Sequence, residues 1–143
     1  MRSLFRLFMS VSVFLYRLTG GSFGGRVQGL NVLLLTSKGR KTGRKRTTPL
    51  GYFEQNGSYV ITASNAGFDS NPAWFYNLKS NPQATIEIGR EAMPVTAEIA
   101  DPELREQLWS RLVALAPGYA NYARRTERII PLVLLRPEQS EGG

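Results

Sequence analysis

The 143-residue chain contains neither cysteine nor histidine. Their absence excludes disulfide bonds, thiolate or imidazole nucleophiles, histidine general acid–base catalysis and the usual zinc sites. Calcium or magnesium would need clustered carboxylates, and Asp69 is isolated in the sequence. We therefore predict no metal site. If the protein is an enzyme, a bound organic cofactor must carry most of its chemistry.

Acidic residues are missing from the first third of the chain. Ten lysines and arginines precede Glu54, the first acidic residue, whereas eight basic and eleven acidic residues occur from Glu54 onward, giving a net charge of +7. Such a basic half indicates an anionic partner: nucleic acid, lipid headgroups or an anionic cofactor. The length and the 42% of apolar residues predict one domain with its own core. The lack of cysteine fits a cytoplasmic protein.

The strongest local feature is the segment from Lys38 to Arg46, in which six of nine residues are basic and two are glycine. An apolar run, Val32 to Leu35, precedes it, and a strand-like run from Leu50 follows. Lysine and arginine donate hydrogen bonds to phosphate or carboxylate, and glycines free backbone N–H groups to do the same. We interpret the segment as an anion-binding turn between two strands. The alternative is a solvated basic turn, because charge runs are usually surface.

Residues 3–18 have the periodicity of one amphipathic helix, within an N-terminal unit at residues 1–19. Three arginines and a length of only about sixteen residues argue against a bilayer span, and no small-x-small cleavage site follows. Two interpretations stay open: the helix packs on the domain as core, or it lies in a membrane interface with its arginines toward anionic headgroups. Its apolar face comprises Leu4, Leu7, Phe8, Val11, Phe14, Leu15 and Leu18.

The rest of the chain has the pattern of short strands with helices appended. A glycine-rich linker at residues 20–29 matches neither nucleotide-binding fingerprint. Asn56-Gly57 indicates a β-hairpin, and Pro49 and Pro94 indicate edge positions or bulges. This order predicts an α+β domain built on a small antiparallel barrel. The predicted strands are 31–37, 47–54, 58–64, 83–89, 93–100 and 131–136. The predicted helices are 72–80, a longer helix that begins at 101, and 119–128. A disordered tail is predicted at 138–143.

Three motifs occur in a fixed order over roughly residues 33–137. L-L-L-T-x-x-G-R-K-T-G-x-x-R-x-x-P-L begins at Leu33, a hairpin ends in A-S at Ser64, and N-P-x-W-x-x-N-L-x-x-N-P begins at Asn71. In this order they resemble the deazaflavin-dependent nitroreductase family, the F420-dependent enzymes of split β-barrel fold. The resemblance implies an FMN-binding split-barrel-like domain at residues 30–137 that binds coenzyme F420. F420 carries a phosphate and a tail of glutamates beyond its deazaflavin ring, so the end far from the ring is polyanionic. Such an end suits the basic turn.

The resemblance also implies the site residues. Ser64 is the candidate to hydrogen-bond a substrate oxygen, and Tyr119 and Tyr122 would flank the substrate pocket, one of them as proton donor. The implied phosphate and tail contacts are Arg40, Lys41, Thr42 and Arg46. The implied contacts along the ring are Thr47, Thr48, Pro49, Leu50, Gly51, Thr62, Ala63, Ser64, Asn65, Ala73, Trp74, Phe75, Tyr76 and Asn77.

Several of these residues also suit purely structural roles. Trp74 and Tyr76 fit core aromatics packed on the sheet, Tyr119 and Tyr122 fit the apolar stripe of a helix, and Ser64-Asn65 fits a plain turn. The chain departs from the family pattern at two positions, since Gly51 stands where members often carry tyrosine and Asn65 where some carry lysine. These departures put nitroimidazole reduction in doubt more than cofactor binding.

The leading hypothesis is an F420H2-dependent reductase that transfers a hydride from the deazaflavin C5 to an electron-poor, hydrophobic acceptor: a quinone, an enone or a nitroaromatic. An interfacial helix would favour a membrane quinone and a place at the inner face of the plasma membrane. The alternatives are a basic nucleic-acid-binding module, a non-catalytic F420 carrier, or a flavin-binding barrel. We expect no nucleic acid, because the cations lie in one turn and one helix rather than along an aromatic-studded sheet. The sequence predicts no oligomeric state.

Overall fold

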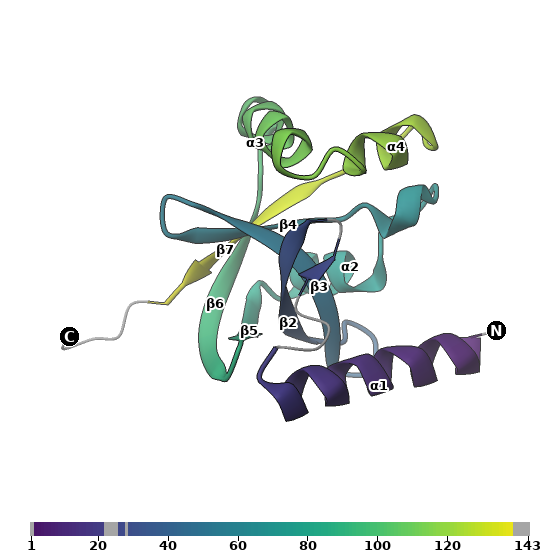
Figure 1. Cartoon of the computed structure of the whole chain (residues 1–143), viewed down its shortest axis with the longest axis vertical. Coiled ribbons are helices and arrows are strands. Elements are labelled where there is room, and N and C mark those ends of the chain that lie inside the picture. The colour runs from purple at the N-terminus through teal and green to yellow at the C-terminus, as the bar shows by residue number, and fades with distance from the viewer. Residues whose placement is uncertain (1, 22–25, 28, 139–143) are drawn as a thin grey trace.

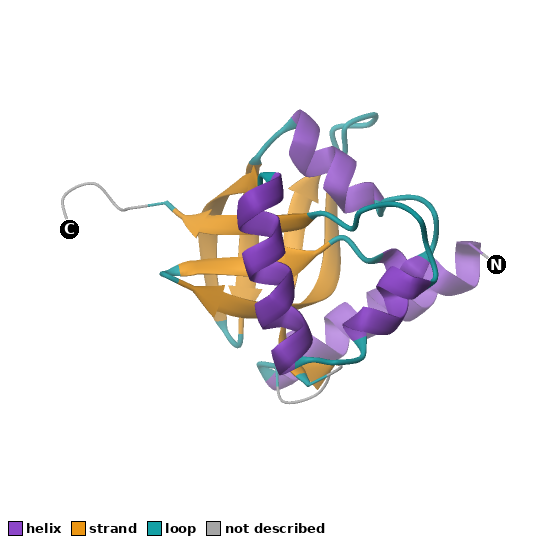
Figure 2. Ribbon diagram, turned by 90° about the horizontal axis from the view of Figure 1, so that it is seen from above, coloured by secondary structure: helices purple, strands orange, loops and turns teal. Residues whose placement is uncertain are grey.

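Six antiparallel strands form a closed barrel with helices packed around it (Figures 1 and 2). The computed structural model describes residues 2–21, 26–27 and 29–138. The predicted tail therefore lies outside the described residues except for Glu138, as do 22–25 and 28 of the predicted linker. The elements are α1 (Arg2–Thr19), β1 (Arg26–Val27), β2 (Leu30–Lys38), β3 (Lys45–Gln55), β4 (Ser58–Thr62), the 3-10 turn η1 (Asn65–Gly67), α2 (Ala73–Ser80), β5 (Gln83–Ile88), β6 (Glu91–Ile99), α3 (Pro102–Leu115), α4 (Tyr119–Arg124) and β7 (Leu132–Pro137).

The barrel closes because β2 pairs with two strands along the same stretch. The strand order is β2-β3-β4-β7-β6-β5, and β5 returns to β2 through pairs such as Leu35↔Ile86. All six predicted strands are present, so the antiparallel barrel in an α+β chain is confirmed. The linker contains the short strand β1, which pairs with the start of β2. The third predicted helix is shorter than expected, because α4 ends at Arg124.

The apolar run at the centre of β2 is buried on both faces. Successive side chains of a strand point to opposite sides. Leu33 and Leu35 belong to the barrel core, whereas Val32 and Leu34 point outward into a cluster with α1. Two-sided burial explains why this strand is continuously apolar rather than alternating. A further cluster lies between the barrel and the helices α3 and α4, and it contains Leu30, Phe53, Val60, Leu108, Leu112, Ala116, Tyr119, Leu132 and Leu134.

β3 has strand neighbours on both sides over only part of its length. β2 pairs with Lys45 to Tyr52, but β4 pairs only with Tyr52 to Gln55. Within the described chain, the second edge of β3 is therefore outside strand pairing from Lys45 to Gly51. Pro49, which lacks an N–H, lies in this stretch, and its predicted edge position is confirmed. The barrel is thus split beside the basic turn.

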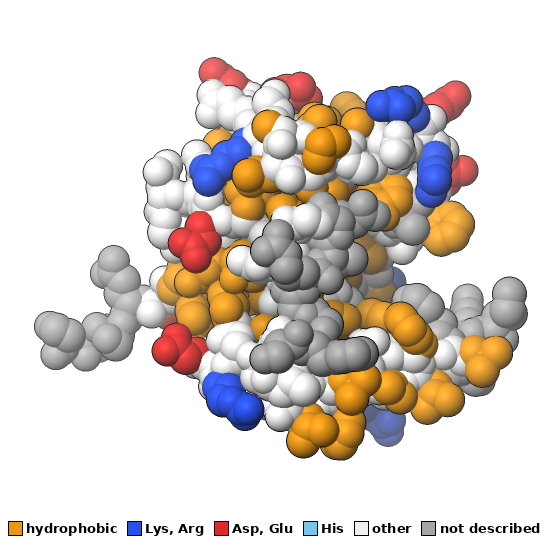
Figure 3. All heavy atoms as spheres, in the orientation of Figure 1, with side chains coloured by type: hydrophobic (Ala, Val, Ile, Leu, Met, Phe, Trp, Pro, Cys, Tyr) orange, Lys and Arg blue, Asp and Glu red, His pale blue; other side chains and the backbone are white. Residues whose placement is uncertain are grey.

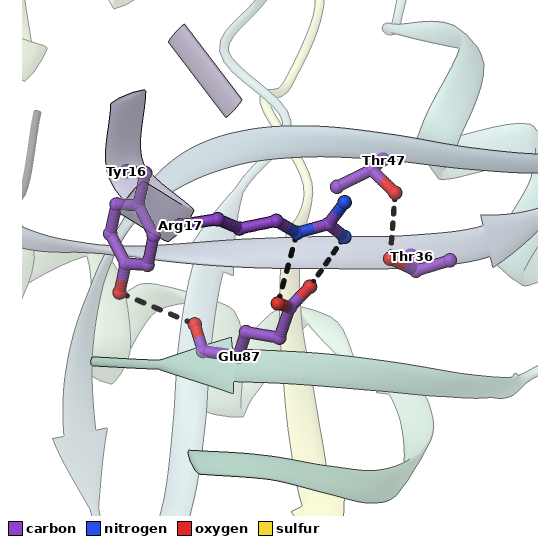
Figure 4. A network of polar contacts seen from close by, with 5 residues as sticks. All are labelled: Tyr16, Arg17, Thr36, Thr47 and Glu87. Carbon is purple, nitrogen blue, oxygen red and sulfur yellow. Dashed lines mark hydrogen bonds and ion pairs between the residues drawn. The ribbon is translucent and has the colours of Figure 1, made fainter. Parts of the chain in front are cut away.

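Helix α1 is held on the barrel by Tyr16 and Arg17 (Figure 4). The Tyr16 side chain is 2% exposed, and its hydroxyl donates to the Val32 carbonyl at 2.9 Å and accepts from the Gly89 N–H at 2.9 Å. Arg17 meets the Glu87 carboxylate with both Nε and Nη2, at 3.0 and 2.7 Å. These contacts attach the last turn of α1 to β2 and to the end of β5.

The predicted apolar face of α1 is not the face that packs. Val13 and Tyr16 are the buried members of the α1 contact, whereas Leu15 is only half-buried. The helix therefore packs on the domain, as one of the two interpretations predicted, but through a face anchored by Tyr16 and not through the predicted apolar face. No helix of the described residues is long and apolar enough to cross a membrane. Figure 3 shows hydrophobic side chains along the outer edge of α1, and the exposed members are Leu4, Leu7, Phe8, Val11, Phe14 and Leu18.

Tyr16→Phe tests this attachment. The substitution leaves the Gly89 N–H and the Val32 carbonyl without the hydroxyl, so we expect the free energy of unfolding to fall by about 1–3 kcal/mol. Urea denaturation measures it. Tyr59→Phe is the matched control, because the Tyr59 hydroxyl makes no hydrogen bond within the described residues. Equal losses in the two variants would contradict the assigned role of Tyr16.

Candidate active site

The basic turn between β2 and β3 has a defined backbone. The Gly39 N–H donates to the Arg44 carbonyl at 2.7 Å, and the Gly43 N–H donates to the Gly39 carbonyl at 2.8 Å. The Thr42 hydroxyl accepts from the Arg44 N–H at 3.2 Å. Gly43 has φ +73°, which a residue with a Cβ rarely adopts. The turn is thus built by its own hydrogen bonds, and its cationic side chains are not needed to hold its shape.

All six basic side chains of the turn are exposed. The three ion pairs of the described chain are Arg17–Glu87, Arg105–Glu106 and Arg136–Glu98, so none of them uses a cation of the turn. Six like charges within nine residues repel one another, and an external anion would relieve that repulsion. The cations of the turn are therefore exposed and without carboxylate partners in the described chain, which leaves them available to an external anion.

Asn77 ties the turn to α2. Its amide oxygen accepts from the Arg40 backbone N–H at 3.1 Å and from Arg40 Nη1 at 3.3 Å. Asn77 is 5% exposed, so these bonds satisfy a buried polar group. The Arg40 guanidinium also lies over the Tyr76 ring, 5.1 Å from its centroid. The structure thereby brings together Arg40, Tyr76 and Asn77, three of the site residues that the resemblance implies.

The earlier aromatic residues of α2 lie deeper. Trp74 is 6% and Phe75 is 5% exposed, and both belong to the barrel core with Leu33 and Leu35. Core packing therefore explains these two residues, and only a small share of either side chain is open to a ligand. Tyr76 is half-buried and meets the Phe75 ring edge-on at 5.4 Å.

The stretch after β4 is a turn that leads into η1. Thr62 and Ala63 are buried at the strand end. Ser64 is half-buried, and the Gly67 N–H donates to its carbonyl at 2.9 Å. Asn65 has φ +47°, and its side-chain Nδ2 donates to the Ser70 carbonyl at 2.9 Å. Asparagine tolerates this backbone region better than most residues do, so here Asn65 stabilises the loop.

Tyr119 and Tyr122 lie one turn apart on α4 and differ in environment. Their rings meet edge-on at 5.4 Å. Tyr119 is 6% exposed, and burial, with a smaller contribution from Tyr122, raises the pKa of its phenol to about 12. Tyr122 is half-buried, and the Arg125 guanidinium lies 5.8 Å from its ring centroid. The helical-stripe interpretation thus describes Tyr119, whereas Tyr122 is the more accessible of the two.

Sequence reasoning missed two polar side chains next to these segments. Ser37 is 2% exposed, and its hydroxyl has no hydrogen-bond partner among the described residues. Ser37 follows Leu33 and Leu35 on the inward side of β2. A polar residue at the third of three inward positions was the signal by which the sequence could have identified it. Arg128 donates to the loop between β4 and α2. A single arginine in a polar stretch belongs to no motif and gives no comparable signal.

A closed antiparallel barrel with a cationic turn beside an unpaired strand edge defines a cofactor-binding split barrel. The sequence matches the F420H(2)-dependent quinone reductase family model over residues 8–137. It is 39% identical over 125 residues to an F420H(2)-dependent quinone reductase of Mycobacterium tuberculosis, which covers 85% of this chain and 84% of that relative. A solved F420-H2 dependent reductase, FDR-A, has 37% identity and a TM-score of 0.67, covering 73% of this chain and 93% of its own. A solved domain-swapped dimer has 32% identity and a TM-score of 0.70, with 89% and 95% covered.

The chain belongs to the F420H(2)-dependent quinone reductase family. It is an F420-dependent oxidoreductase, and reduced F420 is the electron donor. The resemblance to F420-dependent split-barrel enzymes is confirmed. The residues of the turn fit this cofactor by their chemistry, because a set of exposed cations without carboxylate partners in the described chain matches a polyanionic phosphate and glutamate tail.

Replacing Lys41 and Arg46 together by alanine tests the role of the turn. We expect F420 binding to weaken by about 1.5–3 kcal/mol for each charge-assisted bond lost. The free energy of unfolding should change by no more than about 0.5 kcal/mol per site, because both side chains are exposed. Titration followed by cofactor fluorescence and urea denaturation measure the two quantities. Arg90→Ala with Arg136→Ala removes the same charge outside the turn and should leave the affinity almost unchanged.

Proposed function

We propose that the protein reduces a quinone-type acceptor with F420H2 at the surface of a lipid membrane. When bound, the reduced deazaflavin supplies a hydride from its C5. The observation that carries the proposal is the basic turn, whose uncompensated cations are fixed to α2 through Arg40 and Asn77 beside the open edge of β3. Family membership supports the choice of quinone as acceptor.

The turn would hold the anionic end of the cofactor, and the strands would hold the ring. Arg40, Lys41, Thr42 and Arg46 supply charge and hydrogen bonds to the phosphate and tail. The half-buried stretch Thr47–Gly51 offers a backbone edge that no other strand of the described chain uses. Such an edge has N–H and C=O groups able to pair with the polar rim of a planar ring. Residues 62–65 and 73–77 border the same ring in this proposal.

The acceptor side would consist of Ser64 and the α4 tyrosines. Reduction of a quinone to a hydroquinone takes up one hydride and one proton, so a proton donor close to the quinone oxygen is required. The pKa of Tyr119, raised to about 12 by burial, makes that phenol a weaker acid. We therefore assign proton donation to Tyr122, with the Ser64 hydroxyl as hydrogen-bond partner of the acceptor oxygen. Solvent reprotonates Tyr122 after each turnover.

Nitroaromatics and enones are also proposed acceptors, and we expect them to react more slowly than quinones. Asn65 stands where some family members carry lysine, and its side chain is used by the Ser70 carbonyl. Gly51 stands where members often carry a tyrosine ring. A missing cation and a missing ring both reduce the contacts available to a polar nitroheterocycle.

Membrane contact is proposed for α1. Leu4, Leu7, Phe8, Phe14 and Leu18 are between 60% and 69% exposed, and Val11 is 46% exposed. A row of large apolar side chains on one helix face is typical of an interfacial helix. The first 53 residues contain no acid that anionic headgroups would repel. The protein would then contact a membrane-dissolved quinone directly, at the cytoplasmic face of the plasma membrane.

The reductase proposal is tested by following F420H2 oxidation with a menaquinone analogue. We expect turnover by the natural chain and a loss of kcat of roughly 10²-fold in Tyr122→Phe. Tyr119→Phe is the matched control and should lose much less, because burial raises the pKa of the Tyr119 phenol to about 12. F420 binding without turnover with any quinone would contradict the proposal and would favour a carrier.

The membrane proposal is tested by flotation with vesicles that contain anionic lipid. The natural chain should float, and Phe8→Glu with Phe14→Glu should remain with the soluble fraction. Ile99→Glu with Leu115→Glu is the control, because these two side chains are 41% and 48% exposed but lie outside α1. A natural chain that does not float and forms concentration-dependent dimers would instead assign the α1 face to a second copy.

A further inference from the structure

The side chain of Arg128 joins three points of the loop between β4 and α2. It lies after α4, in the connection to β7, and is half-buried. Its Nη2 donates to the Ser64 carbonyl at 2.8 Å, its Nε to the Phe68 carbonyl at 2.8 Å, and its Nη1 to Asn71 Oδ1 at 2.6 Å. One guanidinium therefore fixes the loop at its beginning, middle and end.

Internal bonds such as that from Asn65 Nδ2 to the Ser70 carbonyl shape the loop, but its position against the rest of the domain depends on contacts from outside it. It contains two residues at positive φ, Asn65 at +47° and Gly67 at +80°, and Phe68 is 67% exposed. What holds it comes mainly from the α4 side. Thr126 Oγ1 is 3.1 Å from Asp69 Oδ1, and an added Cβ at Gly67 would stand 3.0 Å from the Arg125 Cβ. Arg128 is the largest of these attachments, with three hydrogen bonds.

Arginine has the geometry that this position requires. Its planar guanidinium carries donors in fixed directions and can serve several acceptors at once, whereas lysine is a single point charge. Burial lowers the pKa of the Arg128 guanidinium, while the nearby Tyr76 and Asp69 oppose that shift. Tyr76 is also the residue under the Arg40 guanidinium. The cation thus lies between the loop, α2 and α4.

We propose that Arg128 is a positioning residue, which sets Ser64 and the start of α2 relative to the tyrosines of α4. This inference rests on the proposed function, because that function places residues 62–65 and 73–77 along the cofactor ring and Tyr122 at the acceptor. The loop that Arg128 holds connects those two segments. Its loss would release the loop at Ser64, Phe68 and Asn71, whereas the buried Asn77 further along α2 keeps its bonds to Arg40 of the basic turn.

The expected kinetic signature follows from this separation. Arg128→Ala should lower kcat with the menaquinone analogue by about 10- to 100-fold, because a displacement of about 1 Å costs up to that much. The dissociation constant of F420 should change less than about threefold, because the tail contacts of the turn are retained. Arg128→Lys should resemble Arg128→Ala in kcat, since the three donors of lysine share one nitrogen and cannot reach acceptors that three different guanidinium nitrogens serve. Millimolar guanidinium should partly restore kcat in Arg128→Ala and should not in Arg128→Lys.

A measurement without cofactor tests the loop directly. In the protein without cofactor, amide hydrogen exchange over residues 65–71 should be at least about tenfold faster in Arg128→Ala, while β2 amides stay unchanged. Arg124→Ala is the matched control, since Arg124 is exposed and donates to Asn121 on its own helix. If Arg128→Ala does not fold, Asn71→Ala removes one of the three bonds and should show a smaller change of the same kind.

The outcomes separate the two proposals. Failure of the natural chain to oxidise F420H2 with a quinone would overturn the proposed function, and the exchange experiment would still report on the loop. Unchanged exchange at residues 65–71, or unchanged kcat in Arg128→Ala, would overturn the positioning role. Parallel losses of kcat, F420 affinity and β2 protection would also overturn it, because they would show a general structural role.

Discussion

The double pairing of β2 is the constraint on which the rest of the structure depends. This strand pairs with β3 on one side and with β5 on the other, which closes the barrel. Its inward residues Leu33 and Leu35 form part of the core, and its outward residues Val32 and Leu34 receive α1. Since β2 is fixed by pairing and by burial on both faces, the turn that follows it starts from a rigid end. A rigid support allows like charges to be held close together.

In the basic turn, the residues that set the backbone shape differ from those that supply the charge. Glycines and backbone hydrogen bonds set its shape, and Asn77 fixes it to α2 through Arg40. The other cations, such as Lys41 and Arg46, stay exposed. Their mutual repulsion opposes folding slightly at low salt, and an anionic cofactor bound there, as we propose, would remove that cost. Cofactor binding should therefore also stabilise the folded chain, as any ligand specific for the native state does.

The sequence predicted the elements better than their contacts. The Asn56-Gly57 hairpin and the helix expected from residue 101 come from local signals, and the structure contains both, with Asp101 Oδ1 accepting from the Leu104 N–H at the start of α3. The docking face of α1 depends on the hydroxyl of Tyr16 and on backbone groups about seventy residues away, the Glu87 carbonyl and the Gly89 N–H, which no local pattern encodes. The sequence did not predict a role for Arg128 for the same reason, because its three acceptors lie in another segment of the chain. The three-motif order identified the family, whereas the sequence left Trp74 open between a cofactor contact and a core aromatic, and the assembled barrel shows it buried.

If α1 binds a membrane, as we propose, the orientation of the site relative to that membrane follows from the β2–β3 hairpin. Helix α1 packs on β2 through Val13 and Tyr16, and the basic turn is the end of β2 and the beginning of β3. The exposed apolar face of α1 and the basic turn are thus both attached to the β2–β3 hairpin. They cannot rotate independently, since Tyr16 and the Arg17–Glu87 pair fix the helix direction. If lipid takes the outer face of α1, the turn and the open edge of β3 acquire a fixed position against the membrane surface. Access of a lipid-dissolved acceptor would then be set by the fold itself and would need no partner protein.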